Sequence, residues 1–239
     1  MAIRPGIDSG SPGAVRYRDG VDGTGDATPH ADPDGPGAAR RGTRLPAAER
    51  RSQLLDIAVE VFARDGFHAT SMNDIAEAAG VTKPVLYQHF SSKRDLFIEL
   101  LTEIGDELRD TIAKATADAA GPRQQIENGF RAYYSYVGDH TDAYRVLFGS
   151  GARRDSEFAS FAKAVEDSIA AVIAELIVVD GEPVENRALL AHSIVGMTEA
   201  TSRYWLAHDR TPDIDTLAEQ LARLAWSGMR GLDRRPGHD

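Results

Sequence analysis

The chain of 239 residues contains no cysteine, which excludes disulfide bonds, zinc sites built on thiolates and catalysis by a thiol. No apolar run approaches the roughly 18–20 residues that a membrane-spanning helix needs. The start of the chain lacks the continuous apolar segment of a signal peptide. Neither a Gly-rich phosphate loop nor a nucleophile elbow is present. We therefore expect a cytoplasmic protein with no membrane partner, no bound metal and no cofactor.

The most informative stretch is residues 70–96, which predicts two short helices joined by a tight turn. Ser71 and Asp74 have capping-box spacing at the start of the first helix, and Gly80 is a natural stop for it. Pro84 falls in the first turn of the second helix, where its missing N–H does no harm. Such a pair forms a helix-turn-helix, whose second helix enters the major groove of DNA. An ordinary helical hairpin with a polar outer face is the alternative that periodicity leaves open.

The polar side chains around the second helix suit a polyanion. Thr82, which can cap this helix, and the following Lys83 and Pro84 are expected to approach base edges. A second group of side chains is expected to hold phosphates and fix the register on DNA; its members are Arg44, Thr70, Tyr87, His89 and Lys93.

A segment rich in glycine and proline precedes the helices. Residues 1–42 hold nine of the 22 glycines and five of the 11 prolines, a composition typical of disorder. Arg40, Arg41 and Arg44 form a basic arm directly before the first helix. Such an arm either grips phosphates or the minor groove of DNA, or is simply a solvated tail.

The amino-acid sequence of the motif resembles the recognition segment of the TetR family of transcription regulators. The resemblance is carried by V-T-K-P-V-L-Y-Q-H-F-S-S-K-R-D-L and by the preceding R-R-S-Q-L-L-D-I-A-V-E-V-F-A-R-D-G-F-H-A-T, and it covers about fifty residues without a gap. It implies a homodimer with a DNA-binding head and a ligand-binding body. The two heads would bind a pseudo-palindromic operator in double-stranded DNA, about one helical turn apart.

Charge is distributed unevenly along the chain, as expected for a protein whose N-terminal head binds DNA. The total is −10 at pH 7, but residues 40–95 carry nine basic and seven acidic side chains. Residues 96–239 carry 15 basic and 24 acidic ones. A weakly cationic head and an acidic body favour one orientation on DNA, although ordinary fluctuation of surface charge would also give so small an excess in the head.

Apolar positions recur at helical spacing through the rest of the chain, and no segment shows sustained strand alternation. The fold class is therefore all-α: a three-helix helix-turn-helix head followed by a helical body for ligand binding and dimerisation. The expected helices span residues 46–64, 93–120, 123–139, 142–149, 156–179, 183–208 and 213–230, in addition to the two of the motif. The expected divisions of the chain are a tail (1–42), a head (43–92), a body (93–231) and a second tail (232–239).

Aromatic and apolar side chains of the body could line a tunnel for a hydrophobic small-molecule effector. The candidates are Phe130, Tyr133, Tyr134, Phe148, Phe161, Val165, Ile169 and Met197. A solid core is the alternative, which spacing alone favours. For the mouth of such a tunnel the sequence offers six cationic groups, Arg123, Arg131, Arg145, Arg153, Arg154 and Arg203.

The last two helices carry large apolar residues at helical spacing, which either form a dimer interface or belong to the core of one chain. The candidates for the interface are Tyr204, Trp205, Leu217, Leu221 and Leu224. In the TetR family these two helices usually pair with their mates in a four-helix interface, so the resemblance favours the first interpretation.

Scattered segments look closer to one branch of the family, the actinobacterial regulators of fatty-acid synthesis. They are R-R-G-T-R-L-P-A-A-E-R-R-S-Q-L-L, K-P-V-L-Y-Q-H-F-S-S-K, Y-R-V-L-F and V-G-M-T-E-A-T-S-R-Y-W-L. This resemblance implies a sensor of long-chain acyl-CoA that acts on fatty-acid and lipid synthesis genes. A repressor of an efflux or catabolic operon that senses another hydrophobic ligand is the alternative.

Two further classes of function are weaker. His192 and Glu199 are seven residues apart on one helix face, which would suit a metal or a general base, but a lone histidine on a helix is usually structural, so we expect no enzyme. A helical adaptor that has lost DNA binding is disfavoured by the basic and aromatic side chains of the recognition helix.

Overall fold

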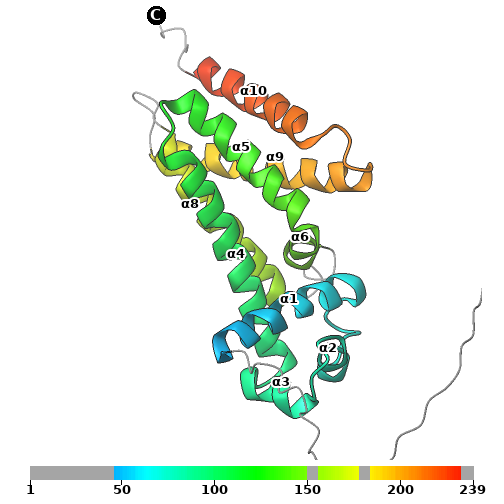
Figure 1. The fold of residues 1–239 in the computed structure, drawn as a ribbon. Coiled ribbons are helices and arrows are strands. Elements are labelled where there is room, and N and C mark those ends of the chain that lie inside the picture. Colours follow the sequence, from blue (N-terminus) through cyan, green and yellow to red (C-terminus); the bar gives the residue numbers. More distant parts are fainter. Residues whose placement is uncertain (1–45, 150–155, 178–183, 233–239) are drawn as a thin grey trace, which may run out of the picture. The chain divides into compact units, whose positions relative to one another are not determined.

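The computed structural model describes residues 46–149, 156–177 and 184–232. Within these ranges all regular secondary structure is helical, as predicted. The helices are α1 (Ala47–Asp65), α2 (Met72–Ala78), α3 (Lys83–His89), α4 (Lys93–Ala117), α5 (Pro122–Asp139), α6 (Thr141–Phe148), α8 (Ser156–Leu176), α9 (Val184–Ala207) and α10 (Ile214–Leu232) (Figure 1). None of the described helices combines the length and the apolar content that crossing a membrane requires.

The helix-turn-helix forms where its start and stop signals lie. The Ser71 hydroxyl accepts a hydrogen bond from the N–H of Asp74, whose carboxylate accepts one from the N–H of Ser71, so the predicted capping box is present. Gly80 follows α2 with a φ of 63°, in the left-handed region that glycine adopts at little cost. Thr82 occupies the N-cap position of α3, but its side chain makes no capping hydrogen bond, so that detail of the prediction is wrong.

Four phenylalanines join the head to the body. Phe62 of α1 and Phe67 of the turn after it pack with Phe97 of α4, whose ring centroid lies 4.8 Å from each of theirs. Phe158 of α8 completes the cluster, 4.6 Å from both Phe67 and Phe97. Edge-to-face and tilted contacts of this kind add to the burial of apolar area. A helix of the body therefore contacts the head directly.

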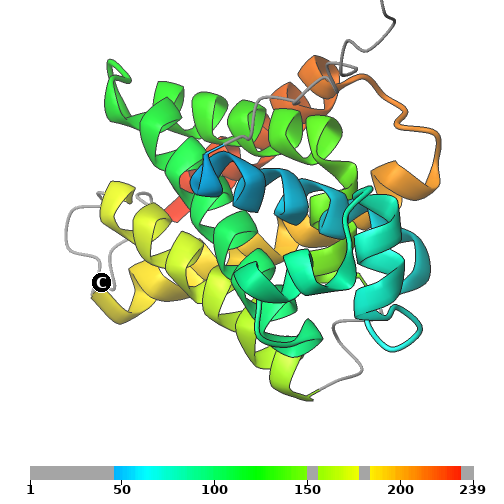
Figure 2. The ribbon, with the colours of Figure 1, turned by 60° about the horizontal axis from the view of Figure 1, so that its bottom comes forward.

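The body is built on α4, which continues from the head and packs against α5 and α8. α10 lies along α5, and α8 and α9 pack against each other (Figure 1). α4 and α8 approach each other closely at Gly105, where an added Cβ would lie 2.4 Å from a methyl carbon of Val165. α1 packs against α6 as well as against α2 and α4 (Figure 2).

Most helix bounds agree with the prediction to within two or three residues. α4 ends at Ala117, because the chain leaves the helix at Asp118, three residues before the predicted stop. α5 begins at Pro122, a good first-turn residue, rather than after it. The predicted tail 1–42, the arm with Arg44, and residues 233–239 lie outside the described residues.

Candidate DNA-binding surface and ligand cavity

The front of α3 presents the side chains that the sequence assigns to DNA. Thr82, Lys83 and Pro84 are exposed, and Tyr87 is 44% exposed although it is a large aromatic residue. The Lys83 ammonium lies 5.9 Å from the centre of the Tyr87 ring. His89 at the end of α3 is half-buried. The surface therefore offers one ammonium, one phenol and two short side chains to a partner.

Thr70, expected to contact a phosphate, is directed into the head instead. Only 2% of this residue is exposed, and its hydroxyl donates a hydrogen bond to the carbonyl of Gly66 at 2.8 Å. Gly66 directly follows α1, and its carbonyl also accepts a hydrogen bond from the Thr70 N–H. The phosphate contact predicted for the Thr70 side chain is therefore wrong.

Lys93 is also committed inside the head. Its ammonium donates to the carbonyls of Phe67 and Thr70, at 2.7 Å each, and lies 4.3 Å from the centre of the Phe67 ring. These contacts tie the start of α4 to the turn between α1 and α2. The phosphate contact predicted for Lys93 does not fit this geometry.

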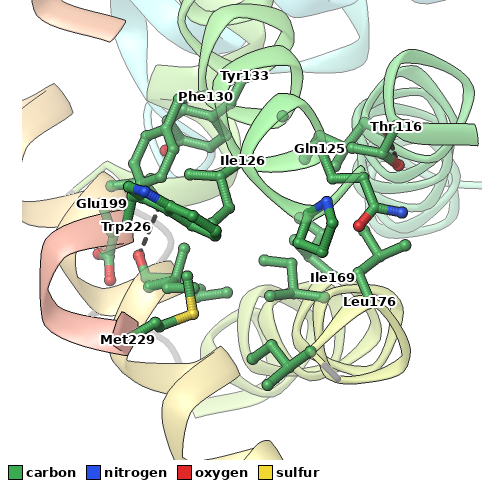
Figure 3. Close-up of a pocket in the computed structure, with 18 of the residues that line it drawn as sticks. Thr116, Gln125, Ile126, Phe130, Tyr133, Ile169, Leu176, Glu199, Trp226 and Met229 are labelled. Carbon is green, nitrogen blue, oxygen red and sulfur yellow. Dashed lines mark hydrogen bonds between the residues drawn. The ribbon is translucent and has the colours of Figure 1, made fainter. Parts of the chain in front are cut away.

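A cavity of about 260 Å³ lies between the helices of the body (Figure 3). Most of its wall is apolar, and it is formed by α4, α5, α6, α8, α9 and α10. One end is buried, because Phe130, Tyr133, Phe148 and Ile169 are each at most 6% exposed. At the other end Pro122 and Arg230 line the cavity and are exposed to solvent.

Half of the predicted ligand residues line this cavity, namely Phe130, Tyr133, Phe148 and Ile169. Tyr134 does not line it; its side chain is fully buried, and its hydroxyl is hydrogen-bonded to Thr201 of α9. Phe161, Val165 and Met197 pack against the core without lining the cavity. Val165, for example, lies against Gly105 of α4.

α10 also forms part of the cavity wall, although none of its residues is among the predicted ligand contacts. Trp226 and Met229 line it from α10, and Gln125 and Ile126 line it from α5 (Figure 3). Arg230 of α10 lines it too. Trp226 belongs to the apolar face of α10, but periodicity does not tell which helix such a face meets. Carboxylates are present too: Glu166 and Glu199 line the wall, together with the hydroxyls of Thr116 and Thr198.

The arginines considered for the mouth of a tunnel are mostly engaged elsewhere. Three of them pair with carboxylates at the surface; the pairs are Arg123–Glu127, Arg131–Asp215 and Arg145–Asp142. Arg203 pairs with Glu199, which lines the cavity. Arg153 and Arg154 lie outside the described residues. Among the described residues, the arginine that lines the cavity is Arg230, which is not one of the predicted six.

Burial shifts the titration of the tyrosine at the inner end of the cavity. Desolvation raises the pKa of Tyr133 well above its usual range, and the hydroxyl of Ser202 donates to its oxygen at 3.3 Å. Tyr133 is therefore a neutral hydrogen-bonding group at any physiological pH. Among the described residues, no three His, Cys, Asp or Glu side chains gather in a way that could hold a metal ion.

The candidates for the dimer interface separate into two groups. Trp205 is 2% exposed, and its indole N–H donates to the carbonyl of Pro212 at 2.6 Å within the same chain. Leu217 is 8% exposed. These two side chains belong to the core of one protomer, which corrects their assignment. Tyr204 and Leu224 are 64% and 60% exposed, and Leu221 is half-buried.

Two protein families match the chain over most of the described residues. The family described as "Bacterial regulatory proteins, tetR family" matches residues 54–100. The family described as "Tetracyclin repressor-like, C-terminal domain" matches residues 122–228. The first match covers the helix-turn-helix and the start of α4, and the second covers five of the helices around the cavity.

Comparison with individual proteins also shows similarity to transcriptional regulators. The HTH-type transcriptional activator FasR of Mycolicibacterium smegmatis is 36% identical over 194 residues, which cover 81% of this chain and 89% of that protein. A TetR-like transcriptional regulator from Rhodococcus sp. RHA1 has 31% identity and a TM-score of 0.66, over 79% of this chain and 100% of its own. The regulator FadR of Bacillus subtilis, in complex with stearoyl-CoA, shares the fold with a TM-score of 0.65 at 21% identity, over 74% and 98% of the chains.

Proposed function

Because the chain belongs to the tetR family of bacterial regulatory proteins, we propose that it is a transcriptional regulator whose effector is a long-chain acyl-CoA and whose targets are fatty-acid and lipid synthesis genes. The cavity in the body carries the effector part of this proposal. The stearoyl-CoA bound to the B. subtilis regulator and the resemblance to regulators of fatty-acid synthesis support the choice of acyl chain.

The two ends of the cavity suit the two parts of such a molecule. Burial of an apolar chain contributes about 0.8 kcal/mol for each CH₂ group removed from water. The buried end presents apolar side chains such as Phe130 and Phe148 to the acyl chain. The exposed end, at Pro122 and Arg230, leaves the phosphate-bearing part in solvent beside a guanidinium, a favourable partner for phosphate.

DNA binding is assigned to the exposed front of α3. In the proposed complex a homodimer places two such helices in successive major grooves of a pseudo-palindromic operator. Thr82, Lys83 and Pro84 approach base edges, while Tyr87 and His89 hold phosphates. Thr70 and Lys93 are left out of this set, because their polar atoms are used inside the head.

The ligand signal is proposed to reach the head through α8. This helix lines the cavity at Ile169 and Ile173, and nearer its start Phe158 packs against Phe67 of the head and Phe97 of α4. A chain inserted between α8 and α5 changes the position of α8, and packed rings transmit such a shift rather than absorb it. A coupling free energy of about 1–3 kcal/mol is typical of allosteric proteins.

Native mass spectrometry of the purified protein tests this function. Binding of one palmitoyl-CoA per protomer, together with a changed affinity for a duplex selected by the protein from a random pool, is the expected result. If the protein selects a duplex but binds no acyl-CoA, its role as a DNA-binding regulator stands and the proposal of an acyl-CoA effector is wrong. Failure to select any duplex would remove DNA binding itself.

A smaller hydrophobic effector is the second candidate, with an efflux or catabolic operon as the target. The size of the cavity favours it, since about 260 Å³ lies below the range of roughly 300–1,000 Å³ common for ligand pockets. Competition of a compact hydrophobic dye by short-chain but not long-chain acyl-CoA would support this candidate.

A further inference from the structure

Arg51 of α1 makes three contacts that converge on the end of the recognition helix. Its guanidinium donates to the carbonyl of His89, the last residue of α3, at 2.6 Å. It lies over the ring of Phe90, with its central carbon 4.5 Å from the ring centre. It also forms a salt bridge with the carboxylate of Glu99 on α4. One side chain therefore joins α1, the end of α3 and α4.

The contacts use the particular shape of arginine. A planar guanidinium directs N–H groups to two different acceptors while its face rests on an aromatic ring, which a lysine ammonium cannot reproduce. Because the last carbonyls of a helix have no partner within the helix, the bond to His89 satisfies a group that would otherwise depend on water. The three contacts hold the C-terminal end of α3 in place relative to α1 and α4.

Lys93 makes the corresponding link at the other end of the helix-turn-helix. It ties the start of α4 to the carbonyls of Phe67 and Thr70, just before α2. The two cations therefore attach the helix-turn-helix to α4 on both sides, one before α2 and one after α3. Since α4 continues into the body, these links determine how a movement of α4 reaches the recognition helix.

We propose that Arg51 is a positioning residue for operator recognition, which acts through His89 and Glu99 rather than by contacting DNA. This inference rests on the proposed function as a DNA-binding regulator. Base readout requires side chains placed to within a fraction of an ångström, whereas attraction to phosphates tolerates larger displacements. Loss of Arg51 therefore lowers specific binding much more than non-specific binding.

The test uses the full-length protein and two duplexes, one selected by the wild type from a random pool and one scrambled duplex of the same composition. Arg51→Met, Arg51→Lys and Glu99→Gln are compared with Arg50→Met, which removes a cation from the same helix. The dissociation constants are measured from about 0.05 to 0.2 M salt, the range over which phosphate contacts dominate the salt dependence.

For Arg51→Met and Arg51→Lys we expect at least a tenfold loss of affinity for the selected duplex, less than a threefold change for the scrambled one, and an unchanged salt slope. Glu99→Gln gives the sharper result, because it removes a negative charge from the start of α4, beside the head. Simple electrostatics would then raise DNA affinity, but we expect specific affinity to fall. This variant also leaves the Arg51 charge in place should Arg51→Met fail to fold.

Equal losses on both duplexes with a salt slope reduced by about one, the signature of a lost phosphate contact, would overturn the proposal. So would an Arg51→Lys protein that binds like the wild type. A wild-type protein that selects no duplex would instead overturn the proposed function. A partly unfolded variant lowers the active fraction for both duplexes alike, so the ratio of the two affinities separates misfolding from mispositioning.

Discussion

His192 illustrates how a single exposed pair gives a measurable pH response. Its Nδ1 lies 2.8 Å from the carbonyl of Ala188, and its Nε2 lies 3.1 Å from the carboxylate of Asp167, which Lys163 also contacts at 2.8 Å. The carbonyl first and the carboxylate second raise the pKa of His192. A raised pKa in the folded state means that the stabilisation is complete below about pH 6.5, the unfolded value, and is lost as pH rises through the folded pKa.

Asp167→Asn is therefore expected to lower the pKa of His192 and to reduce the fall in melting temperature between about pH 6 and 8. An NMR titration of the imidazole protons measures the first effect, and His208 in the same spectra is the internal reference. An unchanged His192 titration would show that the carboxylate does not reach the ring in solution. Because His192 and Asp167 are about half exposed, the effect on stability is small.

At the scale of helices, the contact between α8 and the head is the feature with the largest expected consequence. Phe158→Leu shortens the side chain that meets Phe67 and Phe97, and the loss in stability is expected to be on the order of 1–2 kcal/mol. The variant is expected to bind palmitoyl-CoA and DNA separately, while the change in DNA affinity on adding palmitoyl-CoA shrinks. Both affinities and their coupling are obtained by fluorescence anisotropy.

Phe161→Leu is the matched control, since it lies one turn further along α8, half-buried and outside the phenylalanine cluster. Unchanged coupling in Phe158→Leu, or an equal loss in both variants, would contradict the proposed role of Phe158. The second of these outcomes would point to general loosening of α8 rather than to a specific contact.

The helices themselves could be predicted because their signals are local. Ser71 with Asp74, Gly80 and Pro84 are short-range capping and turn residues, and each acts where the sequence places it. Thr70 was misassigned because a polar residue next to a recognition helix looks the same in sequence whether it faces DNA or an inner carbonyl.

The cavity could be predicted only in part, for a reason of longer range. Its wall depends on which helix faces meet. An apolar helix face such as that of Trp226 predicts burial, but it does not show which other helix it packs against. The same limit explains Trp205 and Leu217, which have the composition of interface anchors but are buried within one chain. The packing of α9 and α10 against α5 separates these cases.

For the whole molecule, the division of charge agrees with DNA binding through the head, and the exposed apolar residues agree with dimerisation through the body. Regulators of this family bind DNA as dimers, and Leu189, Tyr204 and Leu224 are each at least 60% exposed. Large apolar side chains left in solvent mark interaction surfaces when they gather on neighbouring elements. In the middle of α9, Gly196 has open space where a Cβ would stand, so a second helix could approach closely there.

Tyr204→Glu and Leu224→Glu are therefore expected to give monomers that keep the helical content of the wild type. Each places a carboxylate where the partner's apolar surface would cover it, which costs far more than the lost contact. Without the second head the affinity for a two-site operator is expected to fall by about 100-fold or more. Light scattering after size exclusion gives the mass, and anisotropy gives the affinity.

Gln124→Glu is the control, because it adds the same charge to an exposed position of α5, on neither of the two helices that carry the candidate interface residues. A dimer that persists in both Tyr204→Glu and Leu224→Glu would place the interface on another face of the body. The acidic body makes this comparison informative, since one more carboxylate among 24 acidic residues in 96–239 changes long-range repulsion from DNA very little at physiological salt. A loss of operator binding confined to the two interface variants is then a consequence of lost pairing and not of added charge.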